Sequence, residues 1–402
     1  MRFRLYPTQE QEVLLAEHCA QARFVWNLAV EQLGYRHHRQ ALPNYVMQSQ
    51  QLTEARAAYE WLRAGSQTVQ QQALRDFSQA MANWRGGTHR RPNWRKRGRR
   101  EGFRIVGPQA LRVEQITRRW SRVAIPKVGW VRLRRSRAMT AWKSYRVTLD
   151  PSGRWHIAFA VVPAPLKGPG DGSVVGIDRG VAVTLALSDG GTYQAPSPLG
   201  VRKAARALSR CQRGSNRRQR AKARVAKLHA RTVDRRRDFV EKTSTTIAGR
   251  SDVIRIEDLQ VASMVRSARG TVDQPGRKVA QKAGLNRVVL NAAWTAFATR
   301  LEHKAAGRVE RVDPAFTSQC CSVCGYVAAE SRKRQALFRC VACAYTGNAD
   351  VNAARNIAAG RAVTARGGPV LAGLVNREPQ RGASSVARFG IPVVQHREDV
   401  KG

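Results

Sequence analysis

Two pairs of closely spaced cysteines near the C-terminal end of the chain are its best candidates for metal ligands. Cys321 and Cys324 form one Cys-x-x-Cys pair, and Cys340 and Cys343 form the other. Two such pairs separated by a short spacer can supply the four thiolates of a closed, tetrahedral zinc site. We therefore expect one structural Zn²⁺ ion, with Cys320 as a spare thiol outside the required spacing.

Three acidic residues far apart in the sequence are candidates for a second kind of metal site. Asp178 and Glu257 each end a short apolar run that is typical of a buried strand, and Asp350 lies at the start of a helical run. Each acid alone is weak evidence, because an Asp after a strand is usually a turn residue and one at a helix start is usually a cap. Together, two strand-end acids and one helix-start acid are the arrangement expected of an RNase H-like sheet.

Carboxylates in this arrangement favour phosphodiester cleavage. Hard Mg²⁺ ions prefer oxygen ligands and keep several waters. A pair of such ions about 3.5–4 Å apart can stabilise both the attacking and the leaving oxygen. We therefore predict a metal-dependent nuclease in which Asp178, Glu257 and Asp350 are catalytic and hold two Mg²⁺ ions.

The charge of the chain indicates a polyanionic partner. It has 71 Lys and Arg residues against 28 Asp and Glu residues, a formal net charge of +43 on 402 residues. Unshielded like charge at this density opposes the compact state. The sequence shows no apolar run long enough to span a bilayer, no apolar core of a secretory signal, and clustered cysteines that suit a reducing compartment. We therefore expect a protein of the prokaryotic cytoplasm that acts on DNA, RNA or both and does not bind a membrane.

Two structural units are predicted before a Pro- and Gly-rich linker at 163–172. Thr8 and Gln11 form a capping-box pattern that begins a helical segment. This segment extends to about residue 85, and its aromatic side chains are interpreted as core. Alternation with period two from 103 to 163, with a turn at 150–153, then predicts a small antiparallel β-barrel.

Beyond the linker the pattern alternates between apolar strands and basic helices. The expected elements are strands at 174–178, 181–187 and 253–257, a basic helical zone from about 200 to 249, and a helix from 284 to 306.

Runs of cations in two places are candidates for contact with nucleic-acid phosphates. One run is a basic linker around Trp94, and the other lies in the helical zone between the first two acids. Cations beside an aromatic residue are typical of contact with nucleic acid, although an exposed, solvated helix face is the competing interpretation. The candidate residues are Arg95, Lys96 and Arg97 in the linker, and Arg235, Arg236 and Arg237 in the helical zone.

At these residues the sequence resembles the TnpB family of transposon-associated nucleases and the compact type V CRISPR effectors related to them. The resemblance covers most of the chain up to Ile357. It is strongest at Gly176–Gly180, Ile256–Leu259, Leu301–Ala305, Asp313–Pro314, Thr317–Ser318, Cys321–Gly325 and Asp350–Ile357. The family's catalytic acids fall on Asp178, Glu257 and Asp350. The chain departs from the family at Asn348, where many members have a second Asp, at His303, where a Tyr is common, and in a shorter segment at 305–308.

The resemblance implies an RNA-guided DNA endonuclease with a single RuvC-type site. Its partners would be a guide RNA and a double-stranded target DNA, and the protein itself would read a short flanking motif. The implied organisation is multidomain α+β. It comprises a first strand of the wedge barrel at 1–7, a helical recognition lobe with a basic linker at 8–102, the wedge barrel at 103–165, a RuvC-like nuclease domain at 173–313, a zinc-ribbon insert that binds target nucleic acid at 314–346, the end of the nuclease domain at 347–361, and a poorly ordered tail at 362–402.

Other functions remain open at this stage. An RNA-guided DNA-binding protein with weak or no cleavage would act as a repressor. A guide-independent zinc-finger protein leaves the spaced acids unexplained, and a strand-joining transposase would not be expected to carry a zinc ribbon before the last acid. The sequence leaves open whether the setting is a transposon or a CRISPR system, which guide and flanking motif are used, the oligomeric state and the rate of cleavage.

Overall fold

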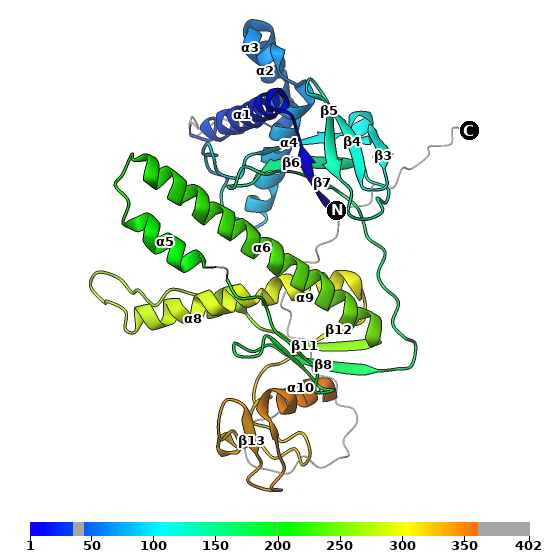
Figure 1. Cartoon of the computed structure of the whole chain (residues 1–402), viewed down its shortest axis with the longest axis vertical. Coiled ribbons are helices and arrows are strands. Elements are labelled where there is room, and N and C mark those ends of the chain that lie inside the picture. The colour runs from blue at the N-terminus through cyan, green and yellow to red at the C-terminus, as the bar shows by residue number, and fades with distance from the viewer. Residues whose placement is uncertain (35–43, 199, 361–402) are drawn as a thin grey trace.

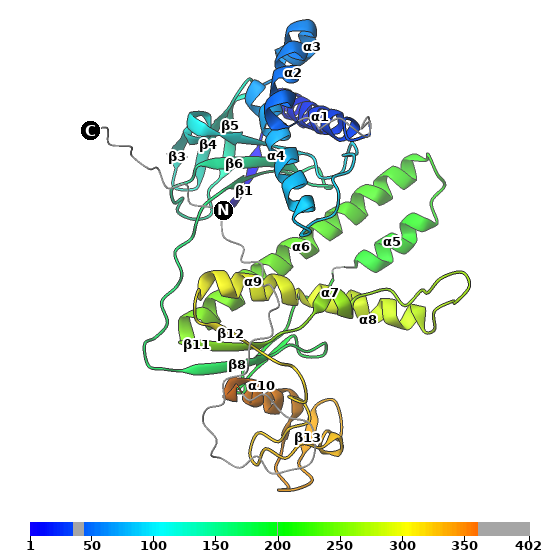
Figure 2. The same cartoon turned by 180° about the vertical axis from the view of Figure 1, so that it is seen from behind.

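The computed structural model describes residues 1–34, 44–198 and 200–360. An N-terminal lobe of helices and a sheet lies at one end, and helix α10 with the cysteine-bearing segment lies at the other (Figures 1 and 2). The long helix α6 (Asn216–Arg250) lies between them. The expected poorly ordered tail at 362–402 lies outside the described residues. No described helix is long and apolar enough to cross a membrane.

The N-terminal lobe is built on a seven-stranded antiparallel sheet with the strand order β2-β6-β7-β1-β5-β4-β3. The strand at the N-terminus lies in the centre, because β1 pairs with both β7 and β5. The expected hairpin turn at 150–153 is confirmed, since it joins β6 to β7. The strands are β1 (Arg2–Tyr6), β2 (Gly102–Val106), β3 (Val113–Thr117), β4 (Trp120–Ile125), β5 (Gly129–Arg134), β6 (Ser144–Leu149) and β7 (Trp155–Phe159).

Over the described residues, the small antiparallel β-barrel that the sequence predicts is a curled antiparallel sheet whose two ends do not pair with each other. Its edge strands β2 and β3 share no ladder within the part of the chain that the structure describes. A 3₁₀ helix, η1 (Gly107–Leu111), connects them and packs Ala110 into the interior. The alternating pattern therefore predicted the strands correctly, but it did not indicate whether the two edge strands of the sheet pair to close a barrel.

Helices of the N-terminal lobe pack against this sheet and share one apolar core with it. The predicted capping box at Thr8 and Gln11 is confirmed at the start of the first helix. Trp26 and Phe77 lie in the core as expected, but Phe24 is 42% exposed. The helices are α1 (Gln9–Glu31), α2 (Tyr45–Ala58), α3 (Glu60–Ala64) and α4 (Gln67–Arg85). Helices and sheet thus fold around a common interior.

The second sheet is mixed and has the order β10-β9-β8-β11-β12. Strands β8, β11 and β12 run parallel to one another, whereas β9 is antiparallel to β8. The expected strand at 181–187 is shorter, because pairing begins only at Leu185. The strands are β8 (Val174–Asp178), β9 (Leu185–Leu187), β10 (Thr192–Tyr193), β11 (Val253–Glu257) and β12 (Val309–Val312).

Helices cover both faces of this sheet. On one face, Ile177, Ile254 and Ile256 pack with apolar residues of α6 and α9 in a fully buried core. On the other face, α10 (Ala349–Ala359) lies against β8 at Gly176, where an added Cβ would meet Ala354 O at 2.1 Å. The absence of a side chain at this position therefore allows the helix to approach the strand closely.

Two helical expectations need correction. The helix expected from 284 to 306 is two helices, α8 (Val279–Ala292) and α9 (Trp294–Lys304). They are separated at Ala293, whose φ is 58°. The basic zone expected from 200 to 249 is also divided, into α5 (Val201–Ser209) and α6. A further short helix, α7 (Val261–Met264), follows β11.

The cysteine-bearing segment is inserted between β12 and α10. It contains the short 3₁₀ helix η2 (Ala329–Ser331) and a two-stranded ladder of β13 (Leu337–Arg339) and β14 (Thr346–Asn348). Its small core consists of Phe338 with Cys321, Cys340 and Ala349. So small a core contributes little burial energy to hold the fold of this segment.

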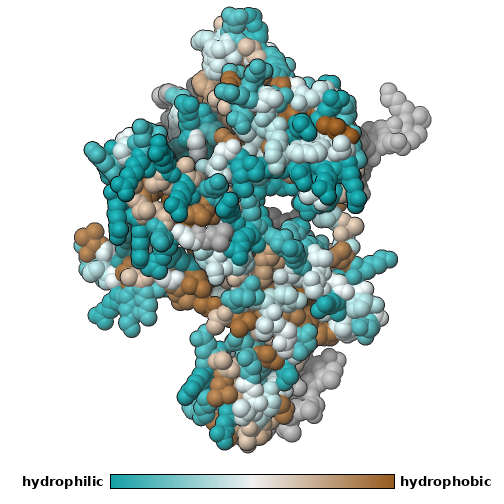
Figure 3. All heavy atoms as spheres, viewed as in Figure 1, coloured by the Kyte–Doolittle hydropathy of each residue, from teal (hydrophilic) through white to brown (hydrophobic). Residues whose placement is uncertain are grey.

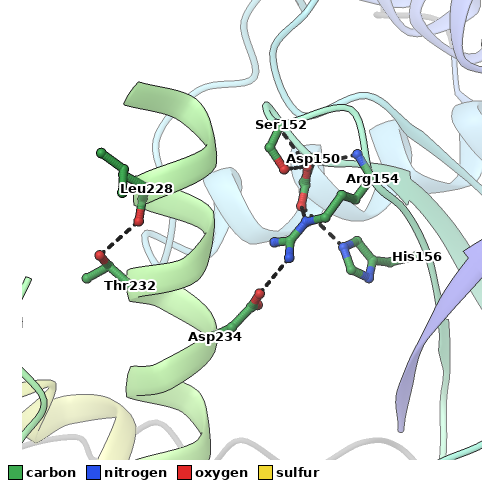
Figure 4. Close-up of polar contacts among 7 residues, drawn as sticks. All are labelled: Asp150, Ser152, Arg154, His156, Leu228, Thr232 and Asp234. Carbon is green, nitrogen blue, oxygen red and sulfur yellow. Dashed lines mark hydrogen bonds and ion pairs between the residues drawn. The ribbon is translucent and has the colours of Figure 1, made fainter. Parts of the chain in front are cut away.

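An ion-pair chain links the N-terminal sheet to α6 (Figure 4). Arg154 on the β6–β7 turn pairs with Asp150 at 2.8 Å and with Asp234 of α6 at 2.7 Å. Burial alone would raise the pKa of Asp150, but hydrogen bonds from Ser152 and Arg154 hold it well below its usual range. The charged carboxylate of Asp150 thus fixes Arg154, which in turn pairs with Asp234 of α6.

Candidate metal sites and nucleic-acid contacts

Two of the three predicted acids lie side by side at one edge of the second sheet. Asp178 is the last residue of β8 and Glu257 is the last residue of β11. These strands are parallel neighbours, and Ile177 is paired with Ile256. Asp178 and Glu257 are the next residues along each strand, so both project to the face that carries α10.

The third acid is brought to the same edge by α10. Asp350 lies in the first turn of this helix, and Asn348 caps the helix by accepting hydrogen bonds from the N–H groups of Asp350 at 2.9 Å and Val351 at 3.1 Å. Asn348 is therefore the N-cap of α10. The start of the helix explains why an amide occupies this position, and Asn348 does not supply a fourth metal-binding carboxylate.

The electrostatics show that the three acids are close together. Burial, followed by the charges of Glu257 and Asp350, raises the pKa of Asp178 to about 7. Burial also raises the pKa of Glu257 and of Asp350, and nearby arginines oppose each shift. Buried like charges of this kind are unfavourable without a cation, which is typical of a functional site.

Two arginines at this edge were not among the predicted site residues. Arg179 is only 5% exposed and donates a hydrogen bond to the backbone oxygen of Glu257. Arg332 projects from the cysteine-bearing segment and pairs with Asp350 at 3.4 Å. Its position next to Asp178 could have indicated that Arg179 belongs to the site. Nothing in the sequence indicated that Arg332 lies beside Asp350, 18 residues further along the chain.

Asp178→Asn is expected to stabilise the metal-free protein at pH 8. The raised folded-state pKa means that the native state binds more protons than the unfolded state between about pH 4 and pH 7. Stability contributed by this proton is therefore present at low pH and is lost as pH rises towards 7. Removing the charge should raise Tm at pH 8 by about 3–5 °C, since each pKa unit corresponds to about 1.4 kcal/mol.

Melting curves at pH 5 and pH 8 with a chelator for Mg²⁺ check this expectation. Asp189→Asn is the control, because Asp189 lies in an exposed turn of the same sheet. Equal Tm values for wild type and Asp178→Asn at pH 8 would contradict it.

The four predicted zinc ligands form a compact cluster. Their Sγ atoms all lie within 4.8 Å of one another, with Cys321 and Cys343 at 3.7 Å and Cys324 and Cys340 at 3.6 Å. Thiolates about 2.3 Å from one zinc ion in a tetrahedron would be separated by about 3.8 Å. Burial raises the pKa of Cys321 and raises that of Cys324 to about 12. At Cys340, by contrast, hydrogen bonds from the N–H groups of Cys343 and Ala342 outweigh burial, lower the pKa and favour the thiolate.

The fifth cysteine of this segment is outside the cluster. Cys320 is 4% exposed, and its thiol is directed to the backbone oxygen of Gly325 at 3.5 Å. Its own backbone oxygen accepts hydrogen bonds from Asn352 at 2.8 Å and Asn356 at 2.7 Å. Its position therefore ties the segment to α10.

The three acids are spread more widely than the cysteines. Among the described residues, the cysteines are the only set of three or more metal-ligating side chains whose ligand atoms all lie within 4.8 Å of one another. Two ligands of a single Mg²⁺ ion can be at most about 4.2 Å apart. The acids therefore do not converge on the position of one ion.

The candidate phosphate contacts have different surroundings. Arg235 and Arg237 of α6 are exposed, but Arg236 between them donates a hydrogen bond to Asn291 at 2.7 Å. In the linker, Lys96 and Arg97 are exposed. The remaining candidate, Arg95, stacks on the ring of Trp26 at 3.6 Å, and burial lowers its pKa to about 10.

Hydrophilic side chains dominate the face shown in Figure 3, including the region of α5 and α6. The same helix, α6, contributes Arg237 to a cavity of about 830 Å³ at the junction with the N-terminal sheet. Arg2, Arg4 and Arg137 line it from the other side. A cavity bordered by so many cations suits a phosphate chain.

Comparison with known proteins gives an independent indication of the family. A profile described as "Probable transposase" matches residues 156–268, one described as "Cas12f1-like, TNB domain" matches 294–357, and one described as "Helix-turn-helix domain" matches 1–40. A putative RNA-guided DNA endonuclease, InsQ of Escherichia coli K12, is 36% identical over 388 residues that cover 92% of this chain and 94% of InsQ. The chain belongs to the TnpB family. The resemblance stated from the sequence is confirmed.

A second relative matches nearly the whole chain. A putative RNA-guided DNA endonuclease of Streptomyces pristinaespiralis is 30% identical over 417 residues, with 96% of this chain and 98% of the relative covered. A solved complex of Cas12f1 with sgRNA and target DNA is similar over 87% of this chain and 83% of the other, at 14% identity and a TM-score of 0.48. The TNB profile spans the segment that carries all four clustered cysteines and Asp350.

Proposed function

We propose that this TnpB-family protein is an RNA-guided DNA endonuclease that cuts both strands of its target at one site built on Asp178, Glu257 and Asp350. The observation that carries the proposal is the convergence of these acids, from three distant parts of the sequence, at one sheet edge. Relatives that cover more than nine-tenths of the chain are named as putative RNA-guided DNA endonucleases, which supports the same activity here.

The second sheet is proposed to be an RNase H-like, RuvC-type nuclease domain. Two parallel strands end in acids, the hairpin of β8 and β9 forms one side, and α10 brings the third acid from the opposite face to α6 and α9. The cysteine-bearing segment would interrupt this domain just before the third acid.

The acids are suited to two Mg²⁺ ions. All the donors are carboxylate oxygens, which Mg²⁺ prefers, and a pair of such ions about 3.5–4 Å apart is the arrangement that serves phosphodiester cleavage. Such ions would supply an activated water and would stabilise charge on the phosphate oxygens. Around them, Arg179 holds the end of β11 through the backbone of Glu257, and Arg332 adds a positive charge beside Asp350.

A structural zinc ion is proposed for the four cysteines. It would order the segment that carries Arg332, because Ser331, next to this arginine, is fully buried and accepts a hydrogen bond from the N–H of Val341 between the second pair of cysteines. A closed thiolate site takes no direct part in chemistry. Its proposed role is to hold the target-nucleic-acid-binding insert against the nuclease domain.

The charge of +43 is proposed to hold the guide RNA and the target DNA. Base pairing would supply the sequence specificity, and the protein would read a short flanking motif. The protein is proposed to act in the prokaryotic cytoplasm, which contains both the DNA and the RNA transcripts.

The protein is expected to copurify with RNA, and this RNA tests the proposed function directly. Sequencing it identifies a candidate guide, which can then be reprogrammed to direct cleavage of a matched DNA. Binding of the matched DNA without cleavage would favour the repressor-like alternative. Failure to retain or use any RNA would contradict the proposal.

RNA affinity should fall steeply with salt, by about 10³-fold or more between 50 and 200 mM for six or more phosphate contacts. Arg235→Ala with Arg237→Ala should weaken binding for every guide and reduce the salt slope by about 1 for each phosphate that is no longer neutralised. Lys242→Ala is the internal control, because this exposed cation of the same helix is already paired with Asp238 at 2.8 Å. Unchanged affinity and slope in the double variant would show that these two cations are only solvated.

A further inference from the structure

An arginine in the middle of a buried strand has a position that the proposed chemistry does not explain. Arg255 lies on β11 between Ile254 and Ile256, which are both fully buried in the core beneath the sheet. Strand periodicity directs Arg255 to the opposite face, together with Glu257. That is the face on which α10 lies.

Arg255 binds the C-terminal end of α10. Its Nη1 donates a hydrogen bond to the backbone oxygen of Ala358 at 2.5 Å. Its Nε is held by Glu310 of the neighbouring strand β12, at 2.7 Å. The guanidinium group also lies directly under Gly360, where an added Cβ would be 3.0 Å from its Cζ. A cation at this end complements the unsatisfied carbonyl groups of the helix.

Arg255 is also next to the point where α10 approaches the sheet most closely. The register of β8 and β11 pairs Arg255 with Gly176. An added Cβ at Gly176 would meet Ala354 O at 2.1 Å and Ala358 N at 2.3 Å. Gly176 on one strand and Arg255 on the next thus both contact the last turn of α10.

The other end of this helix carries the third acid. Asp350 and Ala358 are separated by two turns, about 12 Å of rigid helix. Asp178 and Glu257 are fixed by the ladder between their strands, whereas Asp350 has no backbone bond to that ladder. Any shift of the helix along its axis would therefore move Asp350 relative to the other two acids.

We propose that Arg255, held by Glu310, is a positioning residue that fixes α10 on the sheet and thereby sets the place of Asp350 relative to Asp178 and Glu257. The inference rests on the proposed function, in which these three acids hold the divalent ions. Arg255 itself does not touch the substrate, and it acts through the helix.

Arg255→Met tests this role in the guide-bound protein, because methionine keeps much of the stem and removes both hydrogen bonds. The cleavage rate at saturating target should fall about 10- to 100-fold, as expected for a misplaced catalytic group. Affinity for target DNA should stay unchanged. Mn²⁺ binding to the target-free protein, followed by electron paramagnetic resonance, should weaken about tenfold, as for removal of an outer-shell partner. Arg255→Lys, which can satisfy one of the two partners, should give intermediate values.

Arg300→Met is the matched control for the Mn²⁺ measurement only, since Arg300 pairs with Glu241 at 2.8 Å on the opposite side of the sheet and lines the cavity at the junction with the N-terminal sheet. Wild-type Mn²⁺ affinity and cleavage in Arg255→Met would overturn the inference. Equal losses of Mn²⁺ affinity in Arg255→Met and Arg300→Met would also overturn it, because they would reflect general destabilisation. If Arg255→Met does not fold, wild-type values in Arg255→Lys overturn it and reduced values support it. If the wild type binds Mn²⁺ but does not cut, the proposed function fails and the Mn²⁺ comparison still tests Arg255.

Discussion

Replacing Asp178, Glu257 or Asp350 with alanine should abolish DNA cleavage while leaving RNA and target binding nearly unchanged. Each acid is expected to hold an ion that stabilises the attacking or the leaving oxygen, a contribution of several kcal/mol, so the rate should fall about 10³-fold or more. Cleavage of guide-matched DNA under single-turnover conditions measures the rate, and a gel-shift assay measures binding. Binding should persist because Glu257 and Asp350 are buried, Asp178 is half-buried, and the three acids are few among many surface cations.

Asp273→Ala is the control for this experiment, since Asp273 is an exposed loop residue of the same region. A variant that lacks one of the three acids and still cuts at the wild-type rate would remove that residue from the site. Loss of binding together with cleavage would instead show that the acid supports the fold.

Zinc should be lost when Cys321, Cys324, Cys340 or Cys343 becomes serine. Removing one thiolate from a closed site should unfold the segment locally, because the metal-binding energy, about 10–16 kcal/mol in small zinc domains, is also its folding energy. Elemental analysis of the purified protein should give one zinc per chain in the wild type and little in these four variants. Cleavage should fall as well, because Arg332 and the start of α10 depend on the same segment.

Cys320→Ser is the matched control, as its thiol lies next to the cluster but outside it. It should retain one zinc per chain. Stoichiometric zinc in Cys340→Ser but not in Cys320→Ser would overturn the ligand assignment.

The sequence predicted those parts of the site that depend on local pattern. Asp178 and Glu257 were predicted because each ends an apolar run, and Asp350 because a helical run begins there. The cysteine cluster followed from spacing alone, since Cys-x-x-Cys already brings two thiols together. These patterns can be recognised in short stretches of sequence, without knowledge of the rest of the fold.

Features that depend on tertiary packing were missed. The break at Ala293 has no glycine or proline to mark it, and it accompanies the burial of Trp294, which is 3% exposed. The phosphate contact of Arg95 stays a prediction, but the sequence did not indicate that the linker folds back so that this side chain stacks on Trp26. The contact between Arg332 and Asp350 requires a folded insert, and so no pattern within either segment could indicate it.

The insertion of the cysteine cluster between β12 and α10 also affects how the nuclease assembles. Residues 313–348 must form a loop before the last helix can dock on the sheet, and the entropy lost in closing such a loop grows with its length. A metal ion that joins Cys321 to Cys343 would shorten the free part of this loop and lower the closure penalty by about 1 kcal/mol. The supply of zinc would then affect the fraction of molecules in which Asp350 is in place. In cells deprived of zinc, more of the protein would be synthesised without a correctly positioned third acid.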